Sequence, residues 1–259
     1  MRSTVLLAVI ATLVLPLLSF GQSTLNFPRV IAPAEFRTTG FAIVNPASTN
    51  ASVTFSLYRS DGVLQKASPQ SIAAGGQFSK LASELFGDVG AAGWVQVISA
   101  TAGLQGFWFG GDFRTYADGA EAAPSSTDVI VPLVAPQSEI DIANPSGADV
   151  TLRMNLFGQD GFDLDMPWPQ LIRAKGSFKM GVASMFPRVQ DISLATHMRI
   201  TCQCANASSF AATMVVRDFI AAPSWVVLNA LPASTLTLNI TFPHVLEGAI
   251  GAEIGRAHV

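Results

Sequence analysis

The sequence predicts an all-β protein made of two tandem β-sandwich domains, each with one short helix at the sandwich edge. Three observations predict this fold: a unit of about 100 residues occurs twice, apolar and polar residues alternate within it, and turn dipeptides bound the alternating segments. A unit of about 100 residues is the size of a domain, whereas solenoid repeats run to roughly 20–50 residues. The repeat therefore indicates two self-sufficient units.

The repeat is clearest in two segments of equal length. IVNPASTNASVTFSLYRSDG occupies Ile43 to Gly62, and IANPSGADVTLRMNLFGQDG begins 99 residues later at Ile142. The Asn-Pro and Asp-Gly pairs stand at the same places in both segments. A Pro-x-Val signature starts at Pro28, Pro132 and Pro243, and the offset between copies grows from 99 to 111 along the chain. The insertions therefore fall late in each unit.

Side chains alternate with a period of two inside each unit, which predicts strands with one buried face. The apolar members of the two clearest runs are Val53, Phe55 and Leu57 in the first copy and Leu152, Met154 and Leu156 in the second. The Asp-Gly pairs predict turns, because Gly adopts positive φ at little cost. The Asn-Pro pairs end a strand, because Pro donates no hydrogen bond to a sheet.

One segment of each unit has helical spacing instead. QFSKLASELFGD places Phe78, Leu81, Leu85 and Phe86 on one helical face, and the Gly that follows them can end the helix. The copy, SFKMGVASMFPR, ends at a Pro. We expect a short helix or helical turn at the edge of each sandwich.

The N-terminus has the layout of a secretory signal peptide. Arg2 precedes an apolar run from Val5 to Phe20 that is too short to span a bilayer at about 20 residues. The last seven residues can be encoded by a sequence that resembles a sequencing adapter, so we expect a non-native tail. The expected divisions are a signal peptide (1–21), a first sandwich (22–118), a linker (119–127), a second sandwich (128–234), the start of a truncated third unit (235–252) and the tail (253–259).

The pattern resembles a group of known modules. TGFAIVNPASTNASVTFSLYRSDG, followed by GGQFSKLASELF and GWVQVIS, is similar to tandem immunoglobulin-like or fibronectin-like β-sandwich modules of uncharacterised secreted bacterial proteins. The second unit departs from this pattern, since SEIDIANP lacks the Thr39-Gly40 pair. The resemblance implies an extracellular scaffold or adhesion role at the cell surface or in the periplasm, and it implies no catalytic residues.

Charge and composition favour neither a nucleic-acid nor a membrane-surface partner. Charged residues make up 13% of the chain and the net charge is −3, so no basic patch is indicated. The three histidines are His197, His244 and His258, and none has a neighbour at metal-ligand spacing. We therefore expect no enzyme activity, no cofactor and no metal, and we expect a monomer or part of a longer multi-module chain.

Aromatic residues supply the candidate ligand contacts. GLQGFWFGGDF holds Phe107 and Trp108 among glycines, and Trp168 lies between two prolines. Aromatic rings on an exposed face could stack on sugar rings, while the same triplet in a sandwich is also typical of a buried strand. Core packing is the favoured interpretation, and a binding surface stays open as the alternative.

Two further clusters were candidate sites. Cys202 and Cys204 would point to the same side of a strand, and either two separate thiols or a disulfide fits an exported protein. QDGFDLD gathers Asp160, Asp163 and Asp165, where a polar hairpin is favoured over a calcium site.

Three functions from different classes follow from the sequence. The leading hypothesis is a secreted, non-catalytic structural or interaction protein of the adhesion type. The alternative is a carbohydrate-binding accessory module of a longer extracellular protein. A hydrolase is the third, and it needs two carboxylates or a His–acid pair in one cleft. The unknown partner is a protein or a glycan.

Overall fold

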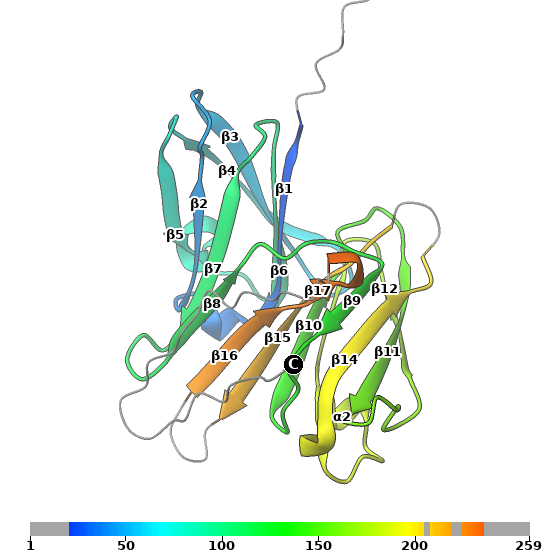
Figure 1. Ribbon diagram of the computed structural model, residues 1–259. Coiled ribbons are helices and arrows are strands. Elements are labelled where there is room, and N and C mark those ends of the chain that lie inside the picture. Colours follow the sequence, from blue (N-terminus) through cyan, green and yellow to red (C-terminus); the bar gives the residue numbers. More distant parts are fainter. Residues whose placement is uncertain (1–20, 205–207, 219–223, 236–259) are drawn as a thin grey trace, which may run out of the picture.

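The computed structural model describes residues 21–204, 208–218 and 224–235, and confirms the all-β sandwich fold. Figure 1 shows two sandwiches packed against each other rather than strung out along a line. Within the described residues, no helix has the length and apolarity needed to cross a bilayer. The expected signal peptide (except Gly21) lies outside the described residues, as do nearly all of the expected third unit and the whole of the tail.

The first sandwich consists of two sheets. Sheet 1a has the strand order β1-β6-β3-β4, and sheet 1b has the order β5-β2-β7-β8. The elements are β1 (Ser23–Ile31), β2 (Thr39–Val44), β3 (Ala51–Tyr58), β4 (Leu64–Ile72), β5 (Gln77–Leu81), α1 (Ala82–Phe86), β6 (Gly93–Ser99), β7 (Gln105–Gly111) and β8 (Ala117–Glu121), with a 3-10 turn at Pro33–Glu35.

The second sandwich repeats this plan. Sheet 2a has the order β12-β11-β14-β9-β17, and sheet 2b has the order β13-β10-β15-β16. The elements are β9 (Asp128–Val131), β10 (Ser138–Ala143), β11 (Val150–Gly158), β12 (Trp168–Ile172), β13 (Ser177–Gly181), α2 (Val182–Met185), β14 (Ala195–Cys202), β15 (Ala211–Asp218), β16 (Ser224–Asn229) and β17 (Leu231–Pro232), with 3-10 turns at Ile192–Leu194 and Ala233–Thr235.

The repeated Asn-Pro pair is a structural device in both copies. Asn45 is fully buried, and its side-chain amide donates hydrogen bonds to the carbonyl groups of Thr49, Ile72 and Ala73. Asn144 does the same in the second sandwich, at 2.8 Å, 3.3 Å and 2.9 Å from its three acceptors. A buried amide with all its donors satisfied ties two loops to the end of one strand.

The Asp-Gly pairs form the expected turns. Gly62 has φ 88° and Gly161 has φ 80°, the left-handed region that favours glycine. In both hairpins the aspartate side chain accepts a hydrogen bond from the backbone amide two residues later. Asp61 accepts from Val63, and Asp160 accepts from Phe162. The repeated dipeptide therefore sets the tips of the β3–β4 and β11–β12 hairpins.

The short helices are present but start later than their spacing predicts. Phe78 and Leu81 belong to β5, where they pair with Ile43 and Gly40 of β2. Only Ala82–Phe86 is helical. Phe178 of the second copy likewise lies in β13. Their spacing in the sequence predicts a helix, but hydrogen bonds to the backbone of the neighbouring strand hold them in a strand.

The expected linker is mostly part of the fold. β8 continues the first sandwich to Glu121, beyond the expected boundary at residue 118. Ala123 then forms a bridge with Asn26, and Ser126 forms one with Phe210 of the second sandwich. The connection between the sandwiches is therefore held by backbone hydrogen bonds at both ends.

Candidate functional site at the junction of the two sandwiches

The outer face of sheet 2b is covered by the first sandwich. Along β10, Ile140 and Ile142 point into the second core, so Asp141 between them points out of the sheet. Asp141 is nevertheless fully buried. Val215 and Val227, which also point outward from sheet 2b, pack with the core of the first sandwich. This face is an interior boundary between the two units.

Arg29 connects the two sandwiches at this boundary. It follows Pro28 in the first Pro-x-Val signature, and its side chain is 2% exposed. Its Nη1 lies 2.7 Å from Oδ2 of Asp141 and 2.9 Å from Oε1 of Glu139, both in the second sandwich. Its Nη2 lies 2.6 Å from Oε1 of Glu35 in the first sandwich. Three carboxylates thus surround one buried guanidinium.

Two more cations complete the cluster. Lys179 Nζ lies 3.0 Å and Arg217 Nη2 lies 3.3 Å from Oε1 of Glu139. Arg29 and Arg217 both lie over the ring of Trp225, each 5.7 Å from its centroid. The described cluster therefore holds three cations and three carboxylates around one aromatic ring, an arrangement in which each charge has a partner.

Burial and pairing shift the pKa values of this cluster in different directions. Burial opposes the charged form of Arg29, but the neighbouring Asp141 and Glu35 outweigh it and raise the Arg29 pKa. Burial raises the pKa of Asp141 to about 6, because its attraction to Arg29 only partly offsets the loss of water. Burial also acts on Glu139, but Lys179 and Arg29 together lower its pKa.

The edges of sheets 1b and 2b lie side by side at β8 and β16, as Figure 1 shows. The amide of Val227 donates to Oδ2 of Asp118 at 2.9 Å. The side-chain amide of Asn229 donates to the carbonyl oxygen of Glu121 at 2.8 Å. Each edge strand thereby receives side-chain or backbone partners from the other sandwich, which protects both edges from pairing with another chain.

A turn of the second sandwich rests on the outer face of sheet 1a. Lys175, in the turn between β12 and β13, has φ 58°, a left-handed conformation that is uncommon for a residue other than Gly. Its carbonyl oxygen accepts a hydrogen bond from Nε1 of Trp94 at 2.8 Å. The amide of Ser177 donates to the carbonyl oxygen of Ser60 at 3.1 Å. The turn is therefore fixed to the first sandwich through its backbone.

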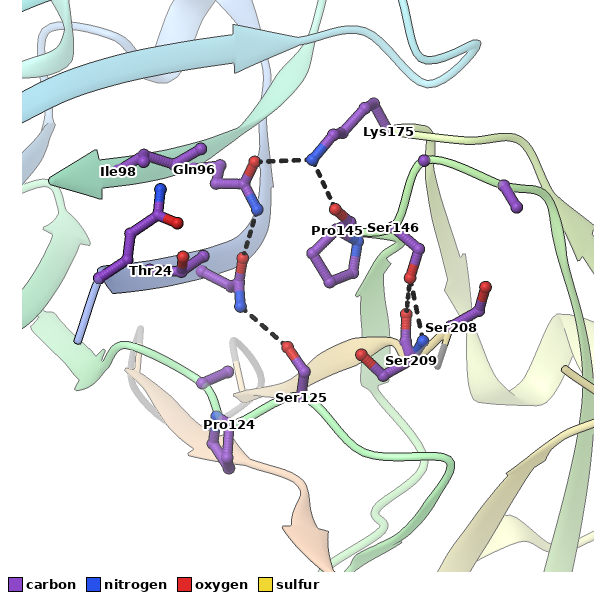
Figure 2. Close-up of a pocket in the computed structure, with 15 residues that line it drawn as sticks. Thr24, Gln96, Ile98, Pro124, Ser125, Pro145, Ser146, Lys175, Ser208 and Ser209 are labelled. Atoms are coloured by element: carbon purple, nitrogen blue, oxygen red, sulfur yellow. Dashed lines mark hydrogen bonds between the residues drawn. The ribbon is translucent and has the colours of Figure 1, made fainter. Parts of the chain in front are cut away.

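The side chain of Lys175 reaches into a cleft of about 640 Å³ between the two sandwiches (Figure 2). Figure 2 shows a chain of hydrogen bonds across this cleft: Lys175 Nζ donates to Gln96 Oε1 at 3.0 Å, and Gln96 Nε2 donates to Asn26 Oδ1 at 3.0 Å. Asn26 Nδ2 then donates to Ser125 Oγ at 2.9 Å. Partial burial lowers the pKa of Lys175.

The chemistry of the cleft is that of a polar, hydroxyl- and amide-lined surface. Its wall on the second sandwich includes Ser146, whose Oγ donates to the carbonyl oxygen of Ser209 and accepts from the amide of the same residue. Gln96 hydrogen-bonds to both Asn26 and Lys175, so part of the polar lining is already paired. Such a lining can orient a small polar molecule, and it holds the two sandwiches in one arrangement.

The aromatic candidates lie away from this cleft. Trp108 is fully buried in the first core, so it cannot stack on a ligand, as the binding-surface alternative required. Phe107, its neighbour in β7, points to the other face and is 36% exposed. Trp168 is partly buried against the second core, and its Nε1 is buried without a hydrogen-bond partner among the described residues. The structure does not bring the three rings together on one surface.

Cys202 and Cys204 form a disulfide in the structure, with Cα atoms 5.1 Å apart. That separation lies inside the range of about 4.4–6.8 Å that disulfides show. The two residues stand at the end of β14, and of the two alternatives open from the sequence the structure has the disulfide.

The acidic and histidine candidates have separate environments. Asp163 accepts a hydrogen bond from Asn155, and Asp165 lies 3.9 Å from Arg188. His197 lies in β14, and its ring stacks on that of Phe157 with ring centroids 4.8 Å apart. Among the described residues, no three His, Cys, Asp or Glu side chains gather as metal ligands. His244 and His258 lie outside the described residues.

The sequence did not single out the junction residues as a site. At each junction position the other copy has a different kind of residue: Leu133 corresponds to Arg29, Ala42 to Asp141 and Gly75 to Lys175. That difference between copies is the signal that could have identified them. It could not be interpreted before the packing of one copy against the other was known.

No protein-family model matches the sequence, and no curated protein matches it. Among solved structures, a glycosyl hydrolase family 2 member from Bacteroides cellulosilyticus is 11% identical, with a TM-score of 0.19 over 80% of this chain and 27% of that chain. A β-glucuronidase 2 from Bacteroides uniformis is 12% identical, with a TM-score of 0.18 over 81% and 26%. This chain thus spans about a quarter of each enzyme's length. TM-scores this low support no functional conclusion.

Proposed function

We propose that this chain is a secreted, non-catalytic structural or interaction protein in which two β-sandwiches act as one rigid unit. The observation that carries the proposal is the buried contact of Arg29 with Asp141 and Glu139 across the junction. A buried guanidinium is tolerated only while its partners stay in place, so the junction cannot open cheaply. A rigid pair presents its outer surfaces at a fixed distance and angle.

The side chains with shifted pKa values support a structural role for this chain. The pKa values of Arg29, Asp141 and Lys175 are shifted, and shifted groups are often functional. Here each of the three is bound by a group of the other sandwich: Asp141 by Arg29, and Lys175 by Gln96. These side chains therefore hold the two sandwiches together.

Export belongs to the same proposal. The apolar segment within residues 1–21 favours secretion, and the Cys202–Cys204 disulfide is of the kind that persists in oxidising compartments. Intact-mass measurement of protein from the culture medium tests both features. A chain that starts at Gln22 and shows one Cys pair oxidised supports export, and an intracellular full-length chain with two free thiols contradicts it.

Small-angle X-ray scattering tests rigidity. The proposal expects the wild-type distance distribution to match the side-by-side arrangement of Figure 1. The Arg29→Glu variant places a carboxylate among Asp141 and Glu139, so we expect its distribution to extend to longer distances. Arg188→Glu, at a 73% exposed position whose ion pair with Asp165 lies within the second sandwich, is the matched control and should leave the distribution unchanged. An extended wild-type particle would overturn the proposal.

A second candidate function is carbohydrate binding in the cleft. The observation that favours it is the lining of amides and hydroxyls around Asn26, Gln96 and Ser125, which suits a hydroxyl-rich ligand. A glycan array with wild type, Ser125→Ala and Phe107→Ala separates the possibilities. Binding lost in Ser125→Ala alone supports the cleft, and binding lost in Phe107→Ala alone places the glycan on β7. An array without signal from folded protein leaves the structural role in front.

A further inference from the structure

The junction has two halves, and the repeat gives each half a free counterpart. We define the acceptor face as strand β1 and the outer face of sheet 1a with the tip of the β3–β4 hairpin, which receive sheet 2b and the turn at Lys175. We define the donor face as the outer face of sheet 2b with that turn. The second sandwich has its own acceptor face on sheet 2a, and the first has its own donor face on sheet 1b.

The free acceptor face keeps the aromatic pair of the occupied one. In the first sandwich, Tyr58 and Trp94 are register partners that stack with centroids 5.6 Å apart beneath the Lys175 turn. The corresponding register partners on sheet 2a, Phe157 and His197, stack with centroids 4.8 Å apart. Trp94 is fully buried by the turn, whereas His197 remains partly exposed.

The second sandwich also exposes large apolar side chains. Leu133, which occupies the place of Arg29 in its Pro-x-Val signature, is 43% exposed. Phe162 and Leu194, beside the β11–β12 hairpin, are 72% and 59% exposed. A Cβ on Gly161 at the tip of this hairpin would meet no atom within 4 Å, whereas one on Gly62 would collide with the carbonyl oxygen of Ala174. The second acceptor face is open where the first is filled.

The free donor face is apolar where the occupied one is charged. The strand registers place Ala42 at the position of Asp141 and Gly40 at that of Glu139. They place Phe107 and Phe109 of β7 at the positions of Thr213 and Val215. Its turn carries Gly75 with φ 65° where the second sandwich has Lys175 with φ 58°.

The two free faces are complementary at corresponding positions. In the occupied junction, Arg29 meets Asp141 and Glu139. If the free faces met in the same geometry, Leu133 would lie against Ala42 and the ring of Phe109, which covers Gly40. A charged pair is thus replaced by an apolar pair on both sides at once, and no buried charge is left without a partner. The turn around Gly75 is exposed, so it is available to rest on the hairpin tip at Gly161.

We propose that the acceptor face of the second sandwich binds the donor face of the first sandwich of a second copy of this chain. The contact repeats between chains the junction that exists within one chain, including an amide of Gln77 donating to the carbonyl oxygen of Gln159, as Ser177 donates to Ser60. The two faces differ, so the contact is heterologous and extends head to tail unless the rotation closes a ring. This inference rests on the proposed rigid unit, which fixes the angle between the two faces.

Sedimentation velocity of the full chain over a range of concentrations tests this proposal. We expect the sedimentation coefficient to rise with concentration, in a series of dimers and longer oligomers. Leu133→Arg or Ala42→Asp leaves one buried charge without a partner, and each should weaken association at least tenfold. Ala102→Arg, at an exposed position in the loop between β6 and β7 outside the junction and both free faces, is the control and should associate like wild type.

Mixing the two disabled chains gives the sharpest outcome. Leu133→Arg disables only the acceptor face and Ala42→Asp only the donor face, so the two intact faces meet in the mixture and should form a heterodimer that neither variant forms alone. The two altered faces then carry an Arg–Asp pair like that of Arg29 and Asp141, which should extend the heterodimer into longer oligomers. A wild-type chain that stays monomeric at all concentrations overturns the proposal, because the face is then solvated or covered by another part of its own chain. Association that survives both substitutions overturns it as well. A monomer that still scatters as a rigid pair would overturn this inference alone and leave the proposed function standing.

Discussion

The Nη1 atom of Arg29 lies 2.7 Å from the Oδ2 atom of Asp141, and the two residues belong to different copies of the repeat. Neither residue is shared by both copies, since Leu133 and Ala42 hold the corresponding places. The copies have therefore diverged at the points where they touch, while they agree at the points that shape each sandwich. Divergence at a junction is what fixes the order in which two similar units pack.

Removal of the guanidinium should destabilise the junction strongly. Arg29→Met removes the hydrogen-bonded ion-pair partner of the fully buried Asp141, and loss of one partner of a buried ion pair costs about 3–5 kcal/mol. We expect the midpoint of urea unfolding to fall, with separate transitions for the two sandwiches. Arg199→Met, which removes a surface ion pair with Asp128 within the second sandwich, should change stability by about 0.5 kcal/mol or less. Equal effects of the two substitutions would contradict the structural role of Arg29.

A double substitution should recover much of that loss. Arg29→Leu with Asp141→Ala installs the pair that the free faces carry, and replacement of a buried ion pair by apolar residues is often neutral in stability. Glu139 keeps Lys179 and Arg217 as partners, so it is not left alone. We expect the double variant to unfold at a higher urea concentration than Arg29→Leu alone. A double variant that is less stable than both single ones would show that the shape of the pair, and not its charge, holds the junction.

The stability of the unit should depend on pH through Asp141. Burial raises its pKa to about 6, above the unfolded value near 3.9, so the folded state binds a proton that the unfolded state lacks between about pH 4 and pH 6. This group therefore contributes less to stability as the pH rises through that window. The stability of wild type minus that of Asp141→Asn should decrease from pH 4 to pH 6, by on the order of 2 kcal/mol. A difference that is constant or increases with pH would show that Arg29 keeps Asp141 ionised below pH 4.

The architecture could be predicted from the sequence because the residues that set it are local. Asn45 and Asp61 act within a few residues of their own hairpins, and their repeats act in the same way. The helix at residues 78–86 was predicted too long because pairing of Phe78 and Leu81 with β2 joins residues far apart in sequence. Local patterns therefore predicted turns and strands well and the competition between helix and strand less well.

The junction could not be predicted for a related reason. Trp108 and Trp94 are both tryptophans in β-strands, yet one fills the first core and the other is covered by the Lys175 turn. Composition and periodicity do not distinguish a core position from a junction position, because the side chain is shielded from water at either one. The left-handed conformation of Lys175 is likewise invisible in the sequence. What the sequence did contain is the contrast between Arg29 and Leu133.

The two hairpin tips offer a matched test of the junction. Gly62 and Gly161 have similar positive φ values of 88° and 80°, so substitution by Ala costs each about 1–2 kcal/mol from the left-handed backbone. At Gly62 the new Cβ also collides with the carbonyl oxygen of Ala174, while at Gly161 it meets open space. We expect Gly62→Ala to lower the free energy of unfolding by clearly more than Gly161→Ala, measured by urea denaturation in dilute solution. The collision is relieved only if the Lys175 turn lifts off, so Gly62→Ala should also expose Trp94 to fluorescence quenching by iodide. Equal losses, with Trp94 still protected, would mean that the turn does not rest on this tip in solution.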